Sequence, residues 1–251
     1  MNYDEAVINP VKGNNSPDPG SVVILVSSGK DMNAICTLLG AGPDDFSNLM
    51  TSRFCTIDQN GRRCSIVGPI IGAPYAVILL ETLIAWGARR FVFFGLCGAI
   101  SREVKTGDIV LPKGAVIEEG TSLHYGENTG KTVFCSKDTF SWIKEILSRE
   151  QFPCHEGIVW TTDAAFRETT GKVSSYQEKN ILAVEMETSA LFTVGRFREV
   201  DVGAILVVSD ELSTLKWKPG FGEERFKKNC KAVQRIITKL CLTIKPELNN
   251  A

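Results

Sequence analysis

The sequence predicts one α/β domain, a β-sheet with helices on both faces. Apolar, β-branched segments that are typical of buried strands alternate with longer segments of helical character along almost the whole chain. No internal repeat or low-complexity linker divides the 251 residues, and a chain of this length can bury a sizeable core. We therefore expect a polar N-terminal tail at 1–20 and a single domain over 21–251.

Five elements are expected in the first half of the chain. In order, they are a strand at 21–28, a helix at 31–39, a strand at 63–67, a helix at 74–86 and a strand at 90–94. The first strand (SVVILVSS) is a β-branched apolar run that ends in small residues, and the last (RFVFF) is the most apolar of the chain. The first helix stops at the sequence GAGP, and the second has Pro74 in its first turn and Gly87 after its end.

The second half repeats the alternation. We expect strands at 108–117, 157–161 and 202–209, and helices at 138–149, 186–197 and 221–244. The strand at 202–209 (VGAILVVS) is apolar enough to be buried on both faces. In the final helix, apolar residues recur at roughly helical spacing from Phe226 to Cys241, which predicts an amphipathic helix that closes the domain.

Composition excludes several classes of protein. The 28 Lys and Arg residues balance 29 Asp and Glu residues, so nucleic acid is not expected as a main partner. No apolar run approaches the roughly 18 residues of a membrane span, and the N-terminus has neither the basic start nor the apolar stretch of a signal peptide. We expect a cytoplasmic protein with eight reduced cysteines and, because none has CxxC spacing, no metal site.

Common catalytic motifs are missing or incomplete. The segment GENTGKT (126–132) has three residues between its glycines, whereas a phosphate-binding P-loop has four. No GxGxxG dinucleotide motif follows a predicted strand. The chain has two histidines and no GxSxG elbow, which argues against a serine hydrolase.

Small and polar residues follow several predicted strands, where ligands bind in sheets of this kind. One such pair is Ser209 and Asp210, which either cap a following helix or form part of a site. Nearby in the predicted fold, Glu185 and Glu187 enter an otherwise apolar helix. They either complement the helix dipole, or accept hydrogen bonds from two neighbouring hydroxyls such as those of a ribose.

Five segments, in this order, resemble the nucleoside phosphorylase superfamily. They are GLCGAI (95–100), TGDIV (106–110), EGTSLH (119–124), VEME (184–187) and VSD (208–210). The resemblance covers roughly residues 20 to 245. It implies a central mixed, twisted sheet flanked by helices, and a homo-oligomer, usually a dimer or a trimer of dimers.

The resemblance also implies a reaction, cleavage of the N-glycosidic bond between ribose and base. This bond breaks through an oxocarbenium-like sugar while negative charge gathers on the base. By the family pattern, Asp210 would donate a proton to a purine ring nitrogen, and Glu187 with Met186 would hold the ribose. Glu185 is a weaker candidate for the same task, and Phe166 either stacks on the base or is a core aromatic. The remaining substrate contacts that we expect are Ser209, Gly98 and Cys97.

The phosphate-binding residues depart from the family pattern. Family phosphorylases carry one arginine after the first strand and another in the strand before the GxxG turn, where this chain has Met32 and Phe93. Leu96 replaces the hydroxyl residue of that turn. Each lost charge-assisted hydrogen bond is worth about 1.5–3 kcal/mol. We expect inorganic phosphate as co-substrate, no other cofactor, and a weak site formed by Ser28, Gly29, Lys30 and Arg53, the last lent across a dimer interface.

Two alternatives stay open. Water is the nucleophile in the nucleosidases of the superfamily, but they use a glutamate after the first strand, and the nearest acid here is Asp31. The other is a nucleoside-binding protein that has lost turnover. A purine-type base is favoured over uracil, because the Gln and Arg that accompany uracil specificity are absent near 169–171. Whether His124 touches substrate is also left open.

Overall fold

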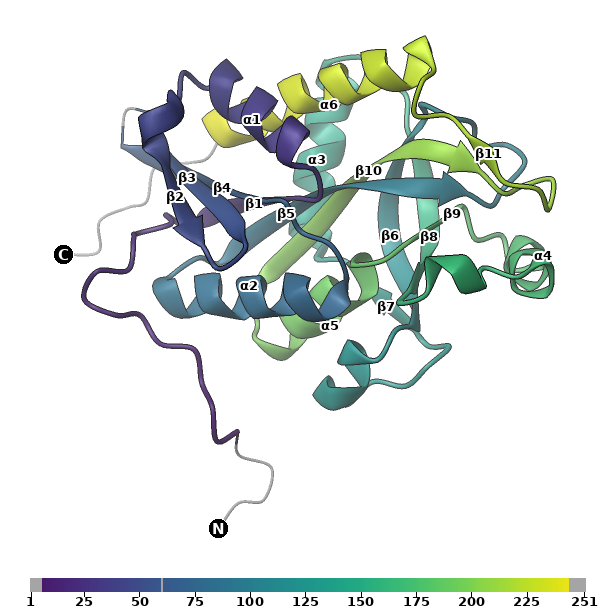
Figure 1. Cartoon of the computed structure of the whole chain (residues 1–251), viewed down its shortest axis with the longest axis horizontal. Coiled ribbons are helices and arrows are strands. Elements are labelled where there is room, and N and C mark those ends of the chain that lie inside the picture. Colours follow the sequence, from purple (N-terminus) through teal and green to yellow (C-terminus); the bar gives the residue numbers. More distant parts are fainter. Residues whose placement is uncertain (1–5, 60, 244–251) are drawn as a thin grey trace.

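One mixed sheet of eleven strands organises the chain (Figure 1), in a computed structural model that describes residues 6–59 and 61–243. The strands are β1 (Val22–Val26), β2 (Phe46–Leu49), β3 (Ser52–Gln59), β4 (Arg62–Gly68), β5 (Arg90–Ala99), β6 (Ile109–Glu118), β7 (Thr132–Phe134), β8 (His155–Thr162), β9 (Ala183–Glu185), β10 (Asp201–Glu211) and β11 (Lys218–Pro219). The helices are α1 (Gly29–Leu38), α2 (Ala73–Trp86), α3 (Lys137–Arg149), α4 (Thr170–Glu178), α5 (Thr188–Phe197) and α6 (Glu224–Leu242), with 3-10 turns η1 (Pro43–Asp45), η2 (Thr121–Tyr125) and η3 (Ala165–Arg167).

Part of the sheet closes on itself. The strand order is β11-β10-β6-β8-β9-β5-β1-β4-β3-β2, and β10 also pairs with β5, so five strands form a ring. The ring contains three parallel pairs (β5 with β10, β6 with β8, β8 with β9) and two antiparallel pairs (β5 with β9, β6 with β10). Closure leaves these strands without a free edge, and β1, β4, β3 and β2 extend the sheet from β5.

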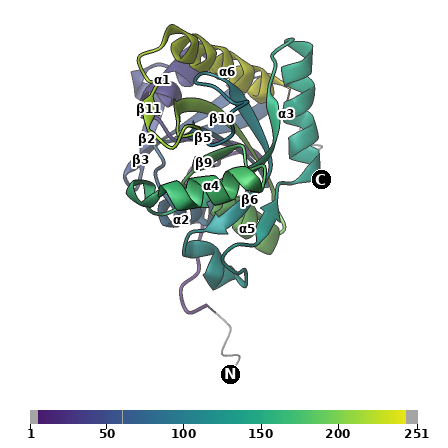
Figure 2. The same cartoon turned by 90° about the vertical axis from the view of Figure 1, so that its right-hand side faces the viewer.

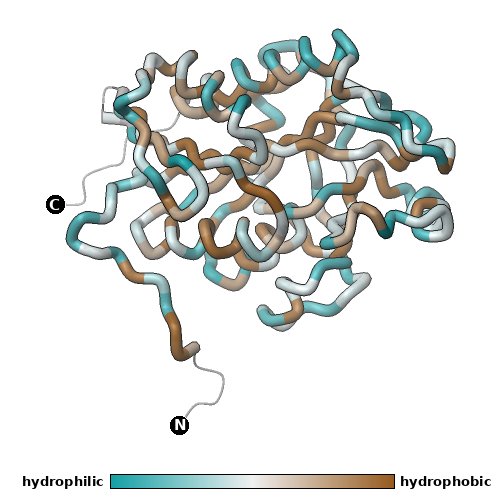
Figure 3. The backbone as a smooth tube through the Cα atoms, viewed as in Figure 1, coloured by the Kyte–Doolittle hydropathy of each residue, from teal (hydrophilic) through white to brown (hydrophobic). Residues whose placement is uncertain are grey.

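Helices cover both faces, which explains why the central strands are apolar throughout. In β1, Val23 and Leu25 pack in the core on the side of α2 and α5. The alternate residues Val22, Ile24 and Val26 pack in a second core, on the side of α1, α3 and α6. Figure 2 shows α1 and α6 on one side of the sheet and α2 and α5 on the other. Figure 3 shows hydrophobic colours concentrated along the central strands.

The structure confirms the predicted α/β fold and its mixed, helix-flanked sheet. Most boundaries agree within about three residues, but β5 runs on to Ala99, because its last residues pair with β9 and β10 inside the ring. Helix α5 begins at Thr188 rather than 186, since Glu187 occupies its N-cap position. The predicted end of the last helix, at 244, lies outside the described residues. The sequence missed α4, the eight-residue strand β3 and the short strands β2, β7, β9 and β11.

Residues 6–20 contain no helix or strand but contact the domain. Lys12 Nζ donates to the carbonyl of Trp86 at 3.1 Å, and Asp18 pairs with Arg63 at 2.5 Å. Ser65 Oγ donates to the carbonyl of Pro19 at 2.8 Å. Val7, Ile8 and Val11 are exposed on this segment. No helix within 6–59 and 61–243 is long and apolar enough to cross a bilayer.

Candidate active site

The predicted site residues gather where strands of the ring end. In the sheet register, Gly98 of β5 lies opposite both Asp210 of β10 and Val184 of β9. On the far side of β9, Glu185 lies opposite Thr161 of β8. Two adjacent rows across the sheet therefore bring together residues that are more than one hundred positions apart in the sequence.

A β-bulge aims the side chain of Asp210. The register of β10 against β5 shifts between Val208 and Asp210, so Ser209 is the extra residue. The Ser209 hydroxyl donates to Asp210 Oδ1 at 2.7 Å, and the Trp217 indole Nε1 donates to Oδ2 at 2.9 Å. Trp217 reaches this point because β11 folds back antiparallel to β10. Two hydrogen bonds thus fix a half-buried carboxylate, and the sequence predicted only the one serine beside it.

The neighbouring GxxG turn is constrained by Asp210. A Cβ atom on Gly98 would lie 2.6 Å from Leu212 Cδ1 and 3.1 Å from Asp210 Oδ2, so a larger residue would displace the carboxylate. The Cys97 thiol is buried, and burial, followed by the charges of Glu185 and Asp210, raises its pKa. Cys97 therefore lies beside the site as a neutral thiol.

Glu187 is a buried carboxyl group with an unusual charge state. Its Oε1 accepts a hydrogen bond from the backbone N–H of Gly72 at 2.5 Å, at the start of α2. Burial, followed by the charge of Glu185, raises the pKa of Glu187 to about 8. The group is therefore mostly protonated at neutral pH, and hydroxyl donors from a ligand would favour its ionised form.

Glu185 has a different role from Glu187. Its Oε2 accepts from the backbone N–H groups of Glu187 (2.8 Å) and Thr188 (2.7 Å), and its Oε1 accepts from Thr161 Oγ1 at 2.5 Å. These bonds anchor the first turn of α5 and hold Glu187 in place. The helix-start interpretation thus fits Glu185, while the carboxyl that remains for a diol is Glu187. Met186, between them, is half-buried.

The residues predicted for phosphate are only partly brought together. Ser28 caps α1 by accepting from the N–H of Asp31 at 3.3 Å, Gly29 opens the helix, and Lys30 is exposed. Ser28 and Lys30 line a cavity of about 580 Å³, together with Leu96 and residues of α6. Arg53, on β3, donates to Asn33 Oδ1 at 2.8 Å and stacks on the Phe46 ring at 3.7 Å.

The two residues that replace the family arginines, Met32 and Phe93, are uncharged and buried. Met32 is fully buried against α6, and Phe93 is fully buried in the core on the α2 side. Both are packing residues in this chain. The replacement of the two arginines is therefore part of the hydrophobic packing, and a phosphate site must use other hydrogen-bond donors.

Comparison with known proteins places the chain in a family. A model described as "Phosphorylase superfamily" matches residues 21–244. The chain belongs to the phosphorylase superfamily.

Two similar proteins carry the names of nucleoside phosphorylases. Guanosine phosphorylase from Halorubrum lacusprofundi is 31% identical over 153 residues, which are 61% of this chain and 63% of that protein. A DeoD-type purine nucleoside phosphorylase from Brevibacillus brevis is 27% identical over 177 residues, 69% of this chain and 74% of that protein. The match thus spans slightly less than two thirds of the first relative and about three quarters of the second.

Solved structures of the superfamily share the fold. Uridine phosphorylase from Vibrio fischeri superposes with a TM-score of 0.75 at 26% identity, over 88% of this chain and 91% of that chain. A P. knowlesi homologue of P. falciparum PNP superposes with a TM-score of 0.73 at 21% identity, over 95% and 97%. The two likenesses confirm the phosphorylase-type architecture of the sheet and its helices.

One acidic residue beside Asp210 was missed by the sequence analysis. Glu168 follows η3 in the connection from β8 to α4, and α4 is tied to the strand ends because Gln177 Nε2 donates to the carbonyls of Ile100 and Ser213. Glu168 is half-buried, and burial, followed by the charge of Asp210, raises its pKa to about 7. Its only sequence signal was its place after a predicted strand.

Phe166 and His124 lie on the surface. Phe166 is 103% exposed, so the interpretation as a core aromatic is wrong, while stacking on a base stays a prediction. His124, on η2, is exposed and lines a cavity of about 420 Å³ with Pro74 and Ile78 of α2. A substrate contact of His124 likewise stays untested.

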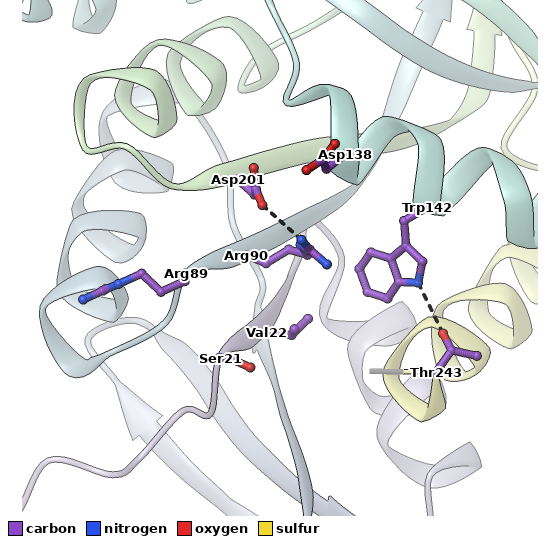
Figure 4. Close-up of a pocket in the computed structure, with 8 residues that line it drawn as sticks. All are labelled: Ser21, Val22, Arg89, Arg90, Asp138, Trp142, Asp201 and Thr243. Atoms are coloured by element: carbon purple, nitrogen blue, oxygen red, sulfur yellow. Dashed lines mark hydrogen bonds and ion pairs between the residues drawn. The ribbon is translucent and has the colours of Figure 1, made fainter. Parts of the chain in front are cut away.

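A further cavity lies at the opposite ends of the strands. Figure 4 shows its lining, in which Arg90 pairs with Asp201 at 3.1 Å and the Trp142 indole donates to Thr243. It has a volume of about 450 Å³. Arg90 stands at the amino end of β5 and Gly98 near its carboxyl end, so this cavity is separate from the site around Asp210.

Proposed function

We propose that this chain cleaves the N-glycosidic bond of a purine-type nucleoside, with inorganic phosphate as the nucleophile. The observation that carries the proposal is the pair of carboxyl groups at one end of the ring, Asp210 fixed by two hydrogen bonds and Glu187 buried against Gly72. The named relatives are a guanosine and a purine nucleoside phosphorylase, which supports a purine, as does the absence of a Gln and Arg pair near 169–171.

The chemistry assigns each carboxyl group one task. As the bond between ribose C1′ and the base breaks, electrons move onto the base, and the protonated form of Asp210 transfers its proton to a purine ring nitrogen. This leaves a carboxylate that the Ser209 and Trp217 donors stabilise, and the carboxylate takes up a proton from solvent before the next turnover. Glu187 accepts hydrogen bonds from the ribose 2′ and 3′ hydroxyls. A phosphate oxygen then bonds to C1′, which gives ribose 1-phosphate and the free base.

Hydrolysis is the second candidate, and the replaced arginines favour it. A hydrolase would need a base to activate water, and Asp31 was the nearest acid in the sequence. In the structure Asp31 is buried, and its Oδ1 accepts a hydrogen bond from Gln234 Nε2 at 2.7 Å. Asp31 is therefore committed to the contact between α1 and α6, which supports phosphate over water. A nucleoside-binding protein without turnover is the third candidate.

Base release from a nucleoside panel tests the proposal. With saturating phosphate, we expect inosine, guanosine or adenosine to be cleaved at least about tenfold faster than uridine, since an acid at the ring nitrogen suits a purine leaving group. Faster cleavage of uridine would contradict the purine assignment. Binding of purine nucleosides with no release of any base would favour the binding protein.

Nucleoside binding is expected to release protons near neutral pH. Free Glu187 holds a proton up to a pKa of about 8, and two hydroxyl donors would lower that pKa. Calorimetric titration at pH 7 in buffers of different ionisation enthalpy should show release of up to one proton per site. The release should vanish in Glu187→Gln. Uptake of protons by the wild-type protein, or equal release by the variant, would contradict the role of Glu187.

Phosphate is expected to be required but to saturate poorly. With Met32 and Phe93 in place of arginines, half-saturation should lie in the millimolar range, where binding is worth only about 4 kcal/mol.

We also propose a cytoplasmic homo-oligomer, a dimer or a trimer of dimers, in which Arg53 serves a neighbouring site. Arg53→Ala should then raise half-saturation several-fold, about 3-fold or more.

The Arg53 effect has two controls. Arg102→Ala, at an exposed position, should leave phosphate saturation unchanged. In dissociated subunits Arg53→Ala should have no further effect, because the lent side chain is already missing. A loss of the same size in dissociated subunits would show that Arg53 acts within its own chain.

A further inference from the structure

The cavity between α1 and α6 carries an excess of positive charge. Five cations line it: Lys30 from α1, and Lys227, Lys228, Lys231 and Arg235 from α6. Its lining acids are Asp31 and Glu224. The cavity therefore has three more cations than acids, in a chain whose net charge is -1.

Most of these cations have no acidic partner among the described residues. Asp31 is engaged by Gln234, and Glu224 pairs with Lys227 at 3.1 Å. Within the described part of the chain, Lys30, Lys228, Lys231 and Arg235 form no ion pair with a carboxylate. Like charges gathered in one concavity repel each other unless an anion lies between them. A bound anion would therefore reduce the repulsion among these cations.

The cavity adjoins the site around Asp210. Its wall includes Ser28, just beyond the carboxyl end of β1, and Leu96 on β5, one residue before Cys97. Leu96 stands where family phosphorylases have a phosphate-binding hydroxyl. An anion held here would therefore lie close to the carboxyl ends of β1 and β5, next to the GxxG turn of the candidate active site.

We propose that the lysines of α6, Lys228 and Lys231, together with Lys30, bind the phosphate group that reacts with the nucleoside, in place of the missing arginines. This inference rests on the proposed function and names the residues of its second substrate site. Lysines act as hydrated point charges rather than bidentate donors, so several are needed to replace two arginines. A site built from them would bind phosphate weakly and with strong dependence on ionic strength.

The test compares two double variants of the full-length protein. Lys228→Gln with Lys231→Gln removes two charges from the cavity, while Lys131→Gln with Lys216→Gln removes two charges from exposed positions elsewhere. We expect the first to raise the phosphate concentration for half-saturation about tenfold, with the KM for nucleoside unchanged, and the second to change it less than about twofold. Equal effects of the two variants, or no effect of the first, would overturn the proposal.

Direct binding separates this inference from the proposed function. Line broadening of the inorganic phosphate ³¹P resonance by the wild-type protein, lost in Lys228→Gln with Lys231→Gln, would support the phosphate site even if no nucleoside were cleaved. Broadening that persists in this variant would overturn it. A nucleoside monophosphate that displaces inorganic phosphate at about tenfold lower concentration would show that the group belongs to a phosphoester, which contradicts the co-substrate assignment.

Discussion

Replacing Asp210 with asparagine is expected to lower kcat/KM for the preferred purine nucleoside by about 100-fold or more. An amide has no acidic proton to give to the departing base, and general acid catalysis typically contributes about 10²–10⁴-fold. The shape of the residue and its contact with the Trp217 indole are retained, so the loss should fall on kcat rather than on KM. Steady-state base release measures both constants.

Two controls accompany the Asp210 variant. Asp138→Asn changes an exposed aspartate at the start of α3 and should leave the rate unchanged. Trp217→Phe removes one of the two hydrogen bonds that aim Asp210, and should lower kcat by about 10-fold or more, since one hydrogen bond to a charged group is worth about 1.5–3 kcal/mol. An Asp210→Asn rate within about threefold of wild type would show that protonation of the base depends on another residue.

Replacing Glu187 with alanine is expected to remove recognition of the ribose diol. Two charge-assisted hydrogen bonds are worth about 3–6 kcal/mol, so kcat/KM should fall by 10²-fold or more. A 2′,3′-dideoxynucleoside should suffer a similar loss with the wild-type protein. The variant should then cleave the normal and the dideoxy substrate at similar rates, because the interaction is already absent. Additive losses would show that Glu187 does not contact the diol.

The raised pKa of Glu187 also predicts how the stability of the protein depends on pH. The folded-state pKa of Glu187 is raised to about 8 from the ordinary 4.5, so the folded state binds the proton more tightly than the unfolded state. This group therefore opposes folding increasingly as pH rises from about 4.5 to about 8. Glu187→Gln should be at least as stable as wild type at pH 8, with its advantage lost at pH 4. A melting temperature lower than wild type at pH 8 would contradict the buried, protonated state of Glu187.

Most of the fold could be predicted because strands that are buried on both faces are recognisable in the sequence as continuous apolar runs. Strands β1 and β10 are continuous apolar runs, since one face packs on α2 and α5 and the other on α1, α3 and α6. Strands β2 and β3 were missed because their mixed polar composition reflects the outer end of the sheet. Closure of the ring by β5 and β10 left no local signal, because pairing is a tertiary property.

The candidate site could be predicted only as far as residue types and motifs go. Motifs singled out Asp210, Glu187 and Glu185 as candidates, and in the structure Glu185 binds the start of α5 while Glu187 accepts a hydrogen bond from Gly72. The Gly72 donor was missed because it lies 115 residues from Glu187 in the chain. The α6 lysines gave no separate signal in the sequence, because charged residues are expected on the outer face of an amphipathic helix. They line a cavity together with Lys30 because α6 packs against α1.

The identity of the sugar product decides the central claim. The wild-type protein is incubated with its preferred purine nucleoside at several phosphate concentrations, including none, and free base, ribose 1-phosphate and ribose are quantified together. Phosphorolysis predicts that base and ribose 1-phosphate appear in equal amounts, and that release stops without phosphate. Free ribose formed at the same rate whether or not phosphate is present would contradict the account and identify the chain as a nucleoside hydrolase.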